Sequence, residues 1–550
     1  MPTQEPKTTA VSADPFSFFQ PTFPPFPHQR DAFLRSCGKK VWAYLMEPGT
    51  GKTKLTLDVA AYLAARGVIN ALLIAAPNDV HAQWVDEQIA LHWPHDHRVP
   101  EVRAIVWESR KARVYKEALA MARGRIHLDG KLPVLSMNHE AFATKRGYAV
   151  AQWFVKTYAR TMFVVDEAHC IQTPKALRTR RIQSLGDKTP VKRILTGTII
   201  GQKPFTVFAP FRFLDPRILG FDSFLAFKHR YGEFEKDHAM RKGKDGKQYL
   251  QEFEVLQGYK NLEELRARMA SHSYRIRKDE CTDLPPKMIS PLWTHMSDAQ
   301  VALYEELKET GLLLLADAEA GKKVKALSVA GFTEEELAER LVEKQGKVSL
   351  AIKLVLMLRL QQIAGGFITD DSKVTRCIEA DVLDVPRIAA TVDYVQRVLE
   401  ESDAKILIWA VFRAEIRALQ EAFDRVIGKG GCRHVISGMN PGERKAAIAN
   451  FKDPRHAERV LIAHPRSLGV GQNFQVARTC VYYSHTPSNI IRTQSEDRVH
   501  RIGQTGTVTL ADVVARNAPI DSTILAIAAG ARAISEEVLS WEPKKFQEML

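Results

Sequence analysis

The stretch MEPGTGKTKLTLDVAAYL at residues 46–63 decides the fold. It continues the apolar run VWAYL, passes through a turn with two glycines, and then repeats apolar residues at helical spacing. A strand, a glycine-rich turn and a helix in this order point backbone amides at an anion bound at the helix N-terminus. The stretch therefore predicts a phosphate-binding loop in an α/β protein.

The residue types in the turn fit a nucleoside triphosphate. Gly49, Thr50 and Gly51 let the backbone approach the phosphates closely. The Lys52 ammonium is suited to the β- and γ-phosphates, and the Thr53 hydroxyl is suited to Mg²⁺. The sequence thus predicts ATP as substrate, with Mg²⁺ as cofactor.

Short apolar runs alternate with helical stretches in two blocks of the chain. Buried strands that alternate with helices predict parallel sheets built from βαβ units. The fold class is therefore α/β, with two parallel-sheet lobes and helical insertions. The first block contains VWAYLM, NALLIAAP, LPVLSMN, TMFVVDE and VKRILTGT, and the second contains AKILIWAV, ERVLIAHP, RTCVYYSH and GTVTLADVVA.

The same rhythm sets the expected domain boundaries. The Pro- and Phe-rich N-terminus lacks a helical or strand period, which indicates a flexible or docked tail. The expected parts are the tail (1–27), lobe 1 (28–215), its helical insertion (216–282), lobe 2 (283–530) with a helical insertion at about 310–380, and a helical tail (531–550).

Two acids end the apolar run TMFVVDEAH at residues 161–169. An acidic turn after a buried strand is common, but a glycine-rich phosphate loop upstream makes a catalytic role the better interpretation. Asp166 is expected to bind Mg²⁺ and Glu167 to polarise the attacking water.

A third signal is QSEDRVHRIGQ at residues 494–504. Arg498 and Arg501 are spaced i, i+3, so on a helix both guanidinium groups would share one face. Such cations stabilise the charge that develops on a transferring phosphoryl group. Without a phosphate loop elsewhere, a solvated basic helix face would be the preferred interpretation.

Composition excludes several classes of protein. The 550 residues are 45% hydrophobic and 26% charged, which is typical of a soluble globular protein, and the six cysteines form no CxxC pair. The N-terminus lacks a secretory pattern and no apolar run could span a bilayer, so a cytoplasmic protein is expected. The formal net charge of +14 is compatible with a nucleic-acid partner.

The phosphate loop, the acid pair and the segment with the two arginines follow one another along the chain. This set of motifs resembles the Swi/Snf-like family of superfamily 2 helicase-type ATPases, whose members translocate on double-stranded DNA. The about 205 residues between LTGT and AKILIWAV also resemble that family, in which helical protrusions fill this gap. Without recognisable appended modules, the chain resembles a compact bacterial or phage member of the family. Such a member would be expected in the cytoplasm, either associated with the nucleoid or in an infected host. The motifs that carry the resemblance are FPHQRDAF, PNDVHAQWVDE, VLSMNHEAF, LTGT, FAPFRFLDPRILGFDSFLAF, YRIRKDECTDLPPK, SLGVGQNF and DRVHRIGQ.

The resemblance implies two RecA-like lobes, a DEAH-box P-loop ATPase, and roles for further residues. Gln29 would read adenine, and Gly471 would also contact ATP. The residues that would couple hydrolysis to motion are His169, Thr196, Thr198 and Gln494. The residues that would contact DNA are Gln83, Trp84, Asn138 and Asn473.

Four positions depart from the family pattern. Met46 replaces the leading glycine of the phosphate loop, and Leu468 replaces a glycine of SLGVGQNF. Ile199 stands where proline is usual, and Gln202 where asparagine is usual. These changes concern coupling rather than hydrolysis, since the catalytic lysine, acids and arginines are all present.

The sequence-based hypothesis is a DNA-stimulated ATPase that translocates along duplex DNA. Two alternatives remain open: a strand-separating DNA or RNA helicase, and a non-catalytic DNA-binding module gated by ATP. The histidine-rich HWPHDH (92–97) is interpreted as a surface loop rather than a metal site.

Overall fold

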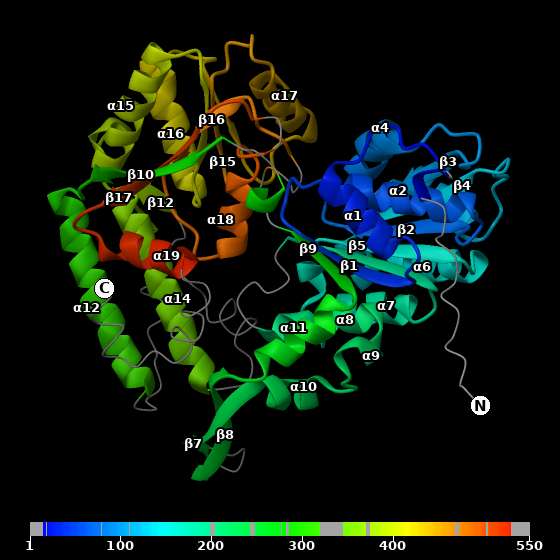
Figure 1. The fold of residues 1–550 in the computed structure, drawn as a ribbon. Helices are drawn as coiled ribbons and strands as arrows, with labels where there is room; N and C mark the ends of the chain where they lie inside the picture. The colour runs from blue at the N-terminus through cyan, green and yellow to red at the C-terminus, as the bar shows by residue number, and fades with distance from the viewer. Residues whose placement is uncertain are drawn as a thin grey trace, which may run out of the picture. The chain divides into compact units, whose positions relative to one another are not determined.

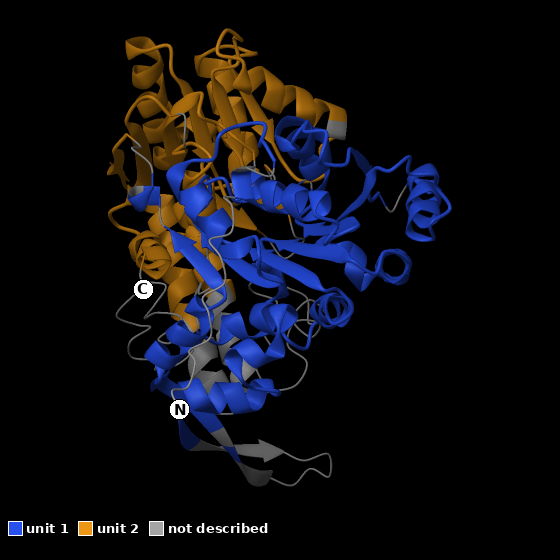
Figure 2. Ribbon diagram, turned by 45° about the vertical axis from the view of Figure 1, so that its right-hand side comes forward, with its two compact units in different colours: residues 1–283 blue, residues 284–550 orange. Residues whose placement is uncertain are grey.

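The computed structural model describes residues 15–529, apart from several short gaps, and divides the chain into two units, 1–283 and 284–550 (Figure 2). The gaps are 18, 79, 109–110, 198–203, 243–247, 277, 282–284, 320–344, 370–373, 467, 469–471 and 502–503.

Unit 1 is built on a seven-stranded sheet in which every neighbouring pair is parallel. Its interior strand β2 (Ala71–Ala76) is buried along its whole length, as expected for an apolar strand covered on both faces. The order is β3 (Val102–Val106), β4 (Leu132–Asn138), β2, β5 (Thr161–Asp166), β6 (Val191–Leu195), β1 (Val41–Met46) and β9 (Ser273–Ile276).

Helices cover both faces of this sheet (Figure 1). On one face lie α1 (Pro27–Ser36), α2 (Lys52–Ala65), α3 (Val80–Gln83), a π-helical turn (Trp84–Ile89) and α4 (Ala90–His92). The other face packs against α5 (Ala112–Ala122), α6 (Lys145–Thr157), α7 (Leu177–Gly186) and α8 (Phe208–Leu214).

The insertion expected to be helical over 216–282 is only partly so. It contains α9 (Pro216–Leu219), α10 (Phe224–Tyr231) and α11 (Leu262–Ala270), but also a long antiparallel hairpin, β7 (Gly232–Lys242) with β8 (Gln248–Tyr259). The sequence contains an Asp-Gly pair at 245–246, which is a hairpin signal between two strands, although these two residues lie outside the described residues. The segment then returns to the core sheet as β9, next to β1.

Unit 2 repeats the parallel-sheet architecture with six strands. The order is β10 (Lys287–Thr294), β17 (Val508–Ala515), β16 (Ala477–Tyr482), β13 (Lys405–Trp409), β15 (Val460–Ala463) and β14 (Cys432–Val435). Two parallel sheets with flanking helices confirm the predicted fold class.

The two faces of the second sheet pack into separate cores, because successive side chains of a strand point to opposite faces. Ile406 and Ile408 belong to the core under α15 (Pro386–Glu401) and α16 (Arg413–Val426). Leu407 and Trp409 belong to the opposite core, which includes α17 (Pro441–Lys452).

The insertion expected at about 310–380 contains the end of α12 (Asp298–Glu319), then α14 (Gln345–Ala364) and a small hairpin, β11 (Phe367–Thr369) with β12 (Thr375–Cys377). Both long helices pack with α19 (Pro519–Ala529) in a separate apolar cluster. The predicted C-terminal tail at 531–550 lies outside the described residues.

Part of the N-terminal tail is docked on unit 1. Phe19 is fully buried, and the ring of Phe16 lies 4.5 Å from that of Phe33 in α1. The Thr22 hydroxyl donates to the Trp93 carbonyl at 3.0 Å. These contacts support the docked alternative for the described part of the tail, and residues 1–14 and 18 lie outside the described residues.

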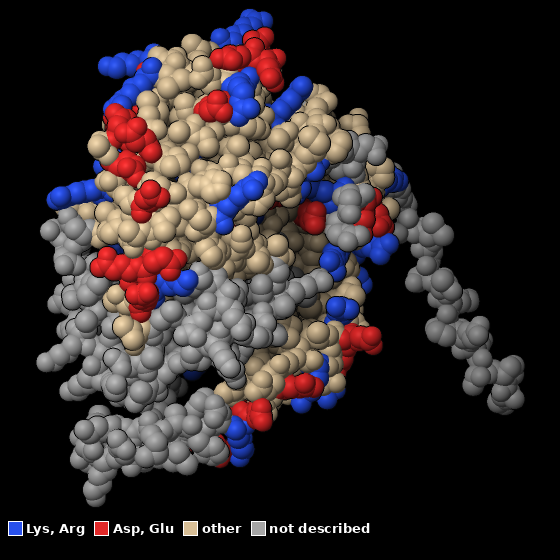
Figure 3. Space-filling view, turned by 90° about the vertical axis from the view of Figure 1, so that its left-hand side faces the viewer, with Lys and Arg blue, Asp and Glu red and all other residues tan. Residues whose placement is uncertain are grey.

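Among the residues coloured in Figure 3, lysines and arginines are intermingled with aspartates and glutamates. Across the described part of the chain, none of the helices is long and apolar enough to cross a membrane.

Candidate nucleotide site

The sheet order of unit 1 brings the predicted nucleotide motifs to one edge. The phosphate loop follows β1, LTGT starts at Leu195, the last residue of β6, and the acid pair starts at Asp166, the last residue of β5. These three strands are neighbours. Because all strands are parallel, these segments leave the sheet at the same carboxyl edge, where open α/β sheets bind ligands.

The phosphate loop has the predicted conformation. Gly49 and Gly51 have φ angles of 87° and 84°, the left-handed region that favours glycine, and α2 begins at Lys52. The Lys52 ammonium donates to the carbonyls of Met46 at 2.8 Å and Glu47 at 3.1 Å. The Lys52 side chain thus folds back over the phosphate loop. Thr53 is the second residue of α2.

Two side chains of α1 support the loop from behind. The Gln29 amide nitrogen donates to the Thr50 carbonyl at 3.2 Å, and the His28 Nε2 lies 2.9 Å from the same oxygen. The Gln29 amide oxygen accepts from the backbone N–H of Phe26 at 3.0 Å, and Gln29 is buried. Its role in reading adenine stays a prediction, and the contact of His28 with the loop was not predicted from the sequence.

The acid pair is buried at the end of β5. Asp166 accepts from the Glu167 backbone N–H at 2.9 Å, and the Glu167 carboxylate lies 3.1 Å from Nδ1 of His169. Glu167 has φ 47° and ψ 57°, a left-handed conformation that is uncommon for a residue with a side chain. This turn directs the second acid away from the strand.

The pKa values of the two acids are shifted in opposite directions. Burial and the adjacent Glu167 charge raise the pKa of Asp166. Burial alone would raise the pKa of Glu167 too, but the hydrogen bond and charge of His169, with Lys52, hold that pKa below its usual value. Burial opposes the charged form of His169, whereas Cys170 and Glu167 raise its pKa to about 10. Glu167 is therefore an ionised carboxylate beside a charged imidazole.

The expected contact of Trp84 with DNA is wrong as far as its side chain is concerned. Trp84 is 1% exposed, and its indole N–H donates to the Asp166 carboxylate at 2.9 Å. A tryptophan that begins a helix after β2 packs inward at this edge because burying its large ring is favourable.

The other predicted residues of unit 1 lie along the same edge. Thr196 is buried directly after β6, and Gln83 is half-buried at the end of α3. Asn138 ends β4, and its amide donates to the Asn78 side chain at 2.6 Å. Thr198 lies outside the described residues.

The donor set fits Mg²⁺. This ion prefers oxygen ligands and is usually held by one or two carboxylates together with substrate phosphates. Asp166 and Thr53 supply such oxygens near the phosphate loop, and Lys52 lies close enough to lower the pKa of both acids of the pair. Among the described residues, no cluster of three or more His, Cys, Asp or Glu side chains offers an alternative metal site.

In unit 2 the predicted helical position of Arg498 and Arg501 is wrong. Helix α18 (Asn489–Glu496) ends before them, and Arg498 and Arg501 lie in the turn and bend that follow. Arg498 is 5% exposed, its guanidinium lies 5.3 Å from the Trp409 ring centroid, and its Nη1 has no hydrogen-bond partner among the described residues. Burial lowers the pKa of Arg498 to about 10 and also lowers that of Arg501. A buried, unpaired donor of this kind is suited to an incoming anion.

The arginine turn is held by its neighbours. The backbone N–H of Phe474, the last residue of SLGVGQNF, donates to the Arg498 carbonyl at 2.8 Å. Arg492 anchors α18 to the sheet through Asp512 at 2.6 Å. Asn473 is exposed and Gln494 half-buried, whereas Gly471 lies outside the described residues.

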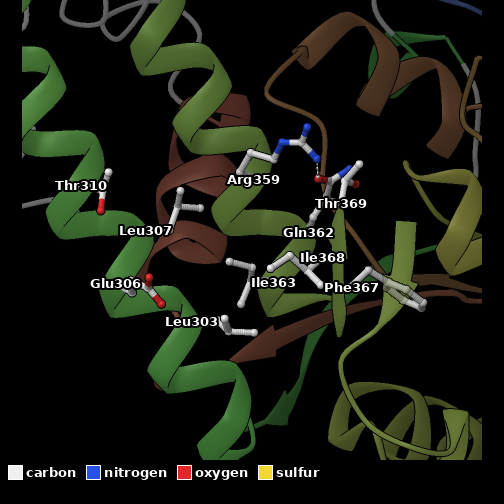
Figure 4. Close-up of a pocket in the computed structure, with 10 residues that line it drawn as sticks. All are labelled: Leu303, Glu306, Leu307, Thr310, Arg359, Gln362, Ile363, Phe367, Ile368 and Thr369. Carbon is white, nitrogen blue, oxygen red and sulfur yellow. Dashed lines mark hydrogen bonds between the residues drawn. The ribbon is translucent and has the colours of Figure 1, made fainter. Parts of the chain in front are cut away.

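One hollow in unit 2 is not a nucleotide site. It lies between α12, α14 and β11, has a volume of about 160 Å³ and is lined by apolar residues such as Leu303 and Ile363 (Figure 4). Its polar rim includes Arg359, which donates to Gln362 at 2.9 Å. Ligand pockets generally measure about 300–1,000 Å³, so this cavity is too small for ATP.

Comparisons with known proteins agree with these motifs. Residues 44–342 match the model of the SNF2-related domain, and residues 389–505 match the helicase conserved C-terminal domain. The chain is 23% identical to the ATP-dependent DNA helicase DDM1 of Arabidopsis thaliana over 83% of this chain and 54% of the relative. It is 24% identical to the ISWI chromatin-remodeling complex ATPase CHR11 of the same plant over 83% of this chain and 37% of the relative. The chain thus spans about half the length of these curated relatives, or less.

Among solved structures, the chain is similar to the Sulfolobus solfataricus SWI2/SNF2 ATPase core in complex with dsDNA. The sequence identity is 18%, the TM-score is 0.37, and the match covers 97% of this chain and 98% of the other.

Proposed function

Because the chain belongs to the SNF2-related family of helicase-like ATPases, as its motifs predicted, we propose that it is a DNA-stimulated translocase on double-stranded DNA driven by ATP hydrolysis. The main observation behind the proposal is that Lys52 and the Asp166–Glu167 pair lie at the same edge of the sheet. A phosphate-binding lysine and two buried acids at that edge are the parts that phosphoryl transfer to water needs.

Each residue has a role in the proposed reaction. The loop amides and Lys52 bind the phosphates, while Thr53 and Asp166 would hold Mg²⁺. When bound, that ion neutralises charge on the phosphate oxygens. Glu167, ionised beside His169, orients the attacking water and accepts its proton.

The arginines of unit 2 complete the proposal. Arg498 and Arg501 would stabilise the charge on the transferring phosphoryl group when the two lobes close on ATP. Opening after hydrolysis would shift the grip on DNA from one lobe to the other. The polar side chains of Gln83, Asn138 and Asn473 stay candidates for the DNA contacts.

Duplex DNA is the proposed track because the relatives are named as DNA helicases and chromatin-remodeling ATPases. Most contacts would be made to phosphates, so binding should tolerate any sequence and weaken steeply with salt. The net charge of +14 is consistent with such a partner.

The test is steady-state ATP hydrolysis without nucleic acid and with duplex DNA, single-stranded DNA or RNA. The Lys52→Ala variant serves as the blank. Strong stimulation by duplex DNA, with little strand release from a tailed duplex, is the expected result. Stimulation mainly by single strands or RNA would favour the helicase alternative, and negligible turnover under all conditions would favour the non-catalytic module.

A further inference from the structure

Trp84 connects two motifs that lie 82 residues apart in the chain. Its indole N–H donates to Oδ2 of Asp166 at 2.9 Å, and the two side chains are 1% and 7% exposed. The other oxygen of Asp166 accepts from the Glu167 backbone N–H at 2.9 Å. Each carboxylate oxygen thus has one fixed donor and keeps a further lone pair free for a cation.

No basic side chain of the described residues forms an ion pair with Asp166, so these two N–H donors orient the carboxylate. Ligands of a metal ion depend on such partners, because a hydrogen bond to the ligand fixes its direction and basicity. Trp84 stands in this relation to Asp166, which we assign to Mg²⁺ on the basis of the proposed function.

The need of a buried indole N–H for an acceptor does not by itself explain the hydrogen bond from Trp84 to Asp166. Trp42 is 5% exposed, and its Nε1 has no hydrogen-bond partner among the described residues. The fold therefore tolerates a buried indole N–H group without an acceptor. The bond from Trp84 to the acid at the end of β5 is specific rather than a general need of buried tryptophans.

The backbone around Trp84 is also unusual. Residues Trp84–Ile89 form a π-helical turn directly after α3. Turns of this type are rare and occur frequently at functional sites. Gln83, a candidate DNA contact, is the residue that immediately precedes Trp84, so any shift of this helix moves the donor of the Asp166 carboxylate.

From these observations we propose that Trp84 is a positioning residue of the ATPase. It holds Asp166 in the orientation that binds Mg²⁺, and it transmits movement of the helix at Gln83 to the metal site. This inference rests on the proposed function and adds to it a physical link between DNA contact and hydrolysis.

The experiment compares Trp84→Phe with Trp42→Phe in the full chain. The first change keeps an aromatic ring but removes the N–H that Asp166 accepts, and the second removes a buried N–H that has no acceptor. Calorimetry measures ADP binding with Mg²⁺ and with EDTA, and thermal melting checks that both variants are folded.

We expect Trp84→Phe to weaken the Mg²⁺-dependent part of ADP binding about 10- to 100-fold, as loss of an outer-shell partner does elsewhere. Binding in EDTA should stay unchanged, and Trp42→Phe should match the wild type in both conditions. In hydrolysis assays the half-saturating Mg²⁺ concentration should rise and the stimulation by DNA should fall for Trp84→Phe alone.

Equal Mg²⁺ dependence in Trp84→Phe and wild type would overturn the inference, as would the same loss in Trp42→Phe. Failure of the proposed function would look different. A wild-type protein without DNA-stimulated turnover would refute the translocase, whereas the calorimetric comparison would still report whether Trp84 positions the metal ligand.

Discussion

The amide nitrogen of Gln29 fills the space in which a side chain at Gly51 would begin. A Cβ built on Gly51 would lie 2.0 Å from that nitrogen, which itself donates to the Thr50 carbonyl. A side chain at this position would therefore have to displace the Gln29 amide. The close approach gives Gln29 a structural role beside the predicted one.

Gly51→Ala should weaken nucleotide binding. The φ of 84° is unfavourable for alanine by about 1–2 kcal/mol, and the Cβ must displace Gln29 in addition. Calorimetric titration with ADP measures the loss. Gly38→Ala is the matched control, because a Cβ there meets nothing within 4 Å. In the Gln29→Ala background the clash is gone, so adding Gly51→Ala should cost only the backbone strain; an equal loss from Gly51→Ala in both backgrounds would contradict the packing argument.

Glu167→Gln should bind ATP and hydrolyse it very slowly. The amide keeps the size of the side chain but cannot accept a proton from water, and general-base catalysis contributes about 10²- to 10⁴-fold. Single-turnover hydrolysis measures the rate, and a fluorescent ATP analogue measures binding. Glu140→Gln, an exposed acid two residues after β4, is the control. Wild-type turnover in Glu167→Gln would remove Glu167 from its role as base.

Local sequence patterns predicted the sheets well and the long-range contacts poorly. The glycine turn, the acids after β5 and the parallel strands follow from short-range rules, and the fold class they predicted is confirmed. The burial of Trp84 against Asp166 could not be predicted, because it depends on how two segments 82 residues apart meet at a sheet edge. A spacing of i, i+3 does not show where a helix ends, so the predicted helical position of Arg498 is wrong: α18 ends at Glu496.

Arg498→Ala should reduce turnover with little effect on the binding of ADP. Arginines in this role accelerate hydrolysis about 10³- to 10⁵-fold, and within the described part of the chain the buried Nη1 of Arg498 has no partner. The rate at saturating ATP and DNA is the measurement, with Arg397→Ala on the exposed face of α15 as control. Arg498→Lys tests the geometry, since lysine keeps the charge but lacks the planar fork. Normal turnover in Arg498→Ala would leave Arg501 as the only candidate among the two.

The stability of unit 1 should carry a pH dependence from Asp58 in α2. Asp58 is 1% exposed and lies 2.5 Å from the Lys54 ammonium, and burial outweighs that ion pair to raise the pKa of Asp58 to about 6. The folded state therefore holds the proton more tightly than the unfolded chain, whose aspartates titrate near about 4. The contribution of Asp58 is fully present below about pH 4 and is lost as the pH rises to about 6.

Two pKa units correspond to about 3 kcal/mol, so the free energy of unfolding of the wild type relative to Asp58→Asn should fall by roughly that amount between pH 4 and 7. Urea denaturation at each pH measures both proteins, and Asp393→Asn, an exposed acid of α15 in an ion pair with Arg397, controls for the loss of a carboxylate. A difference that does not change with pH would mean that Lys54 compensates the burial of Asp58 completely. In that case Lys54→Met should destabilise the protein by about 3–5 kcal/mol at pH 7, because it leaves a buried charge without its partner.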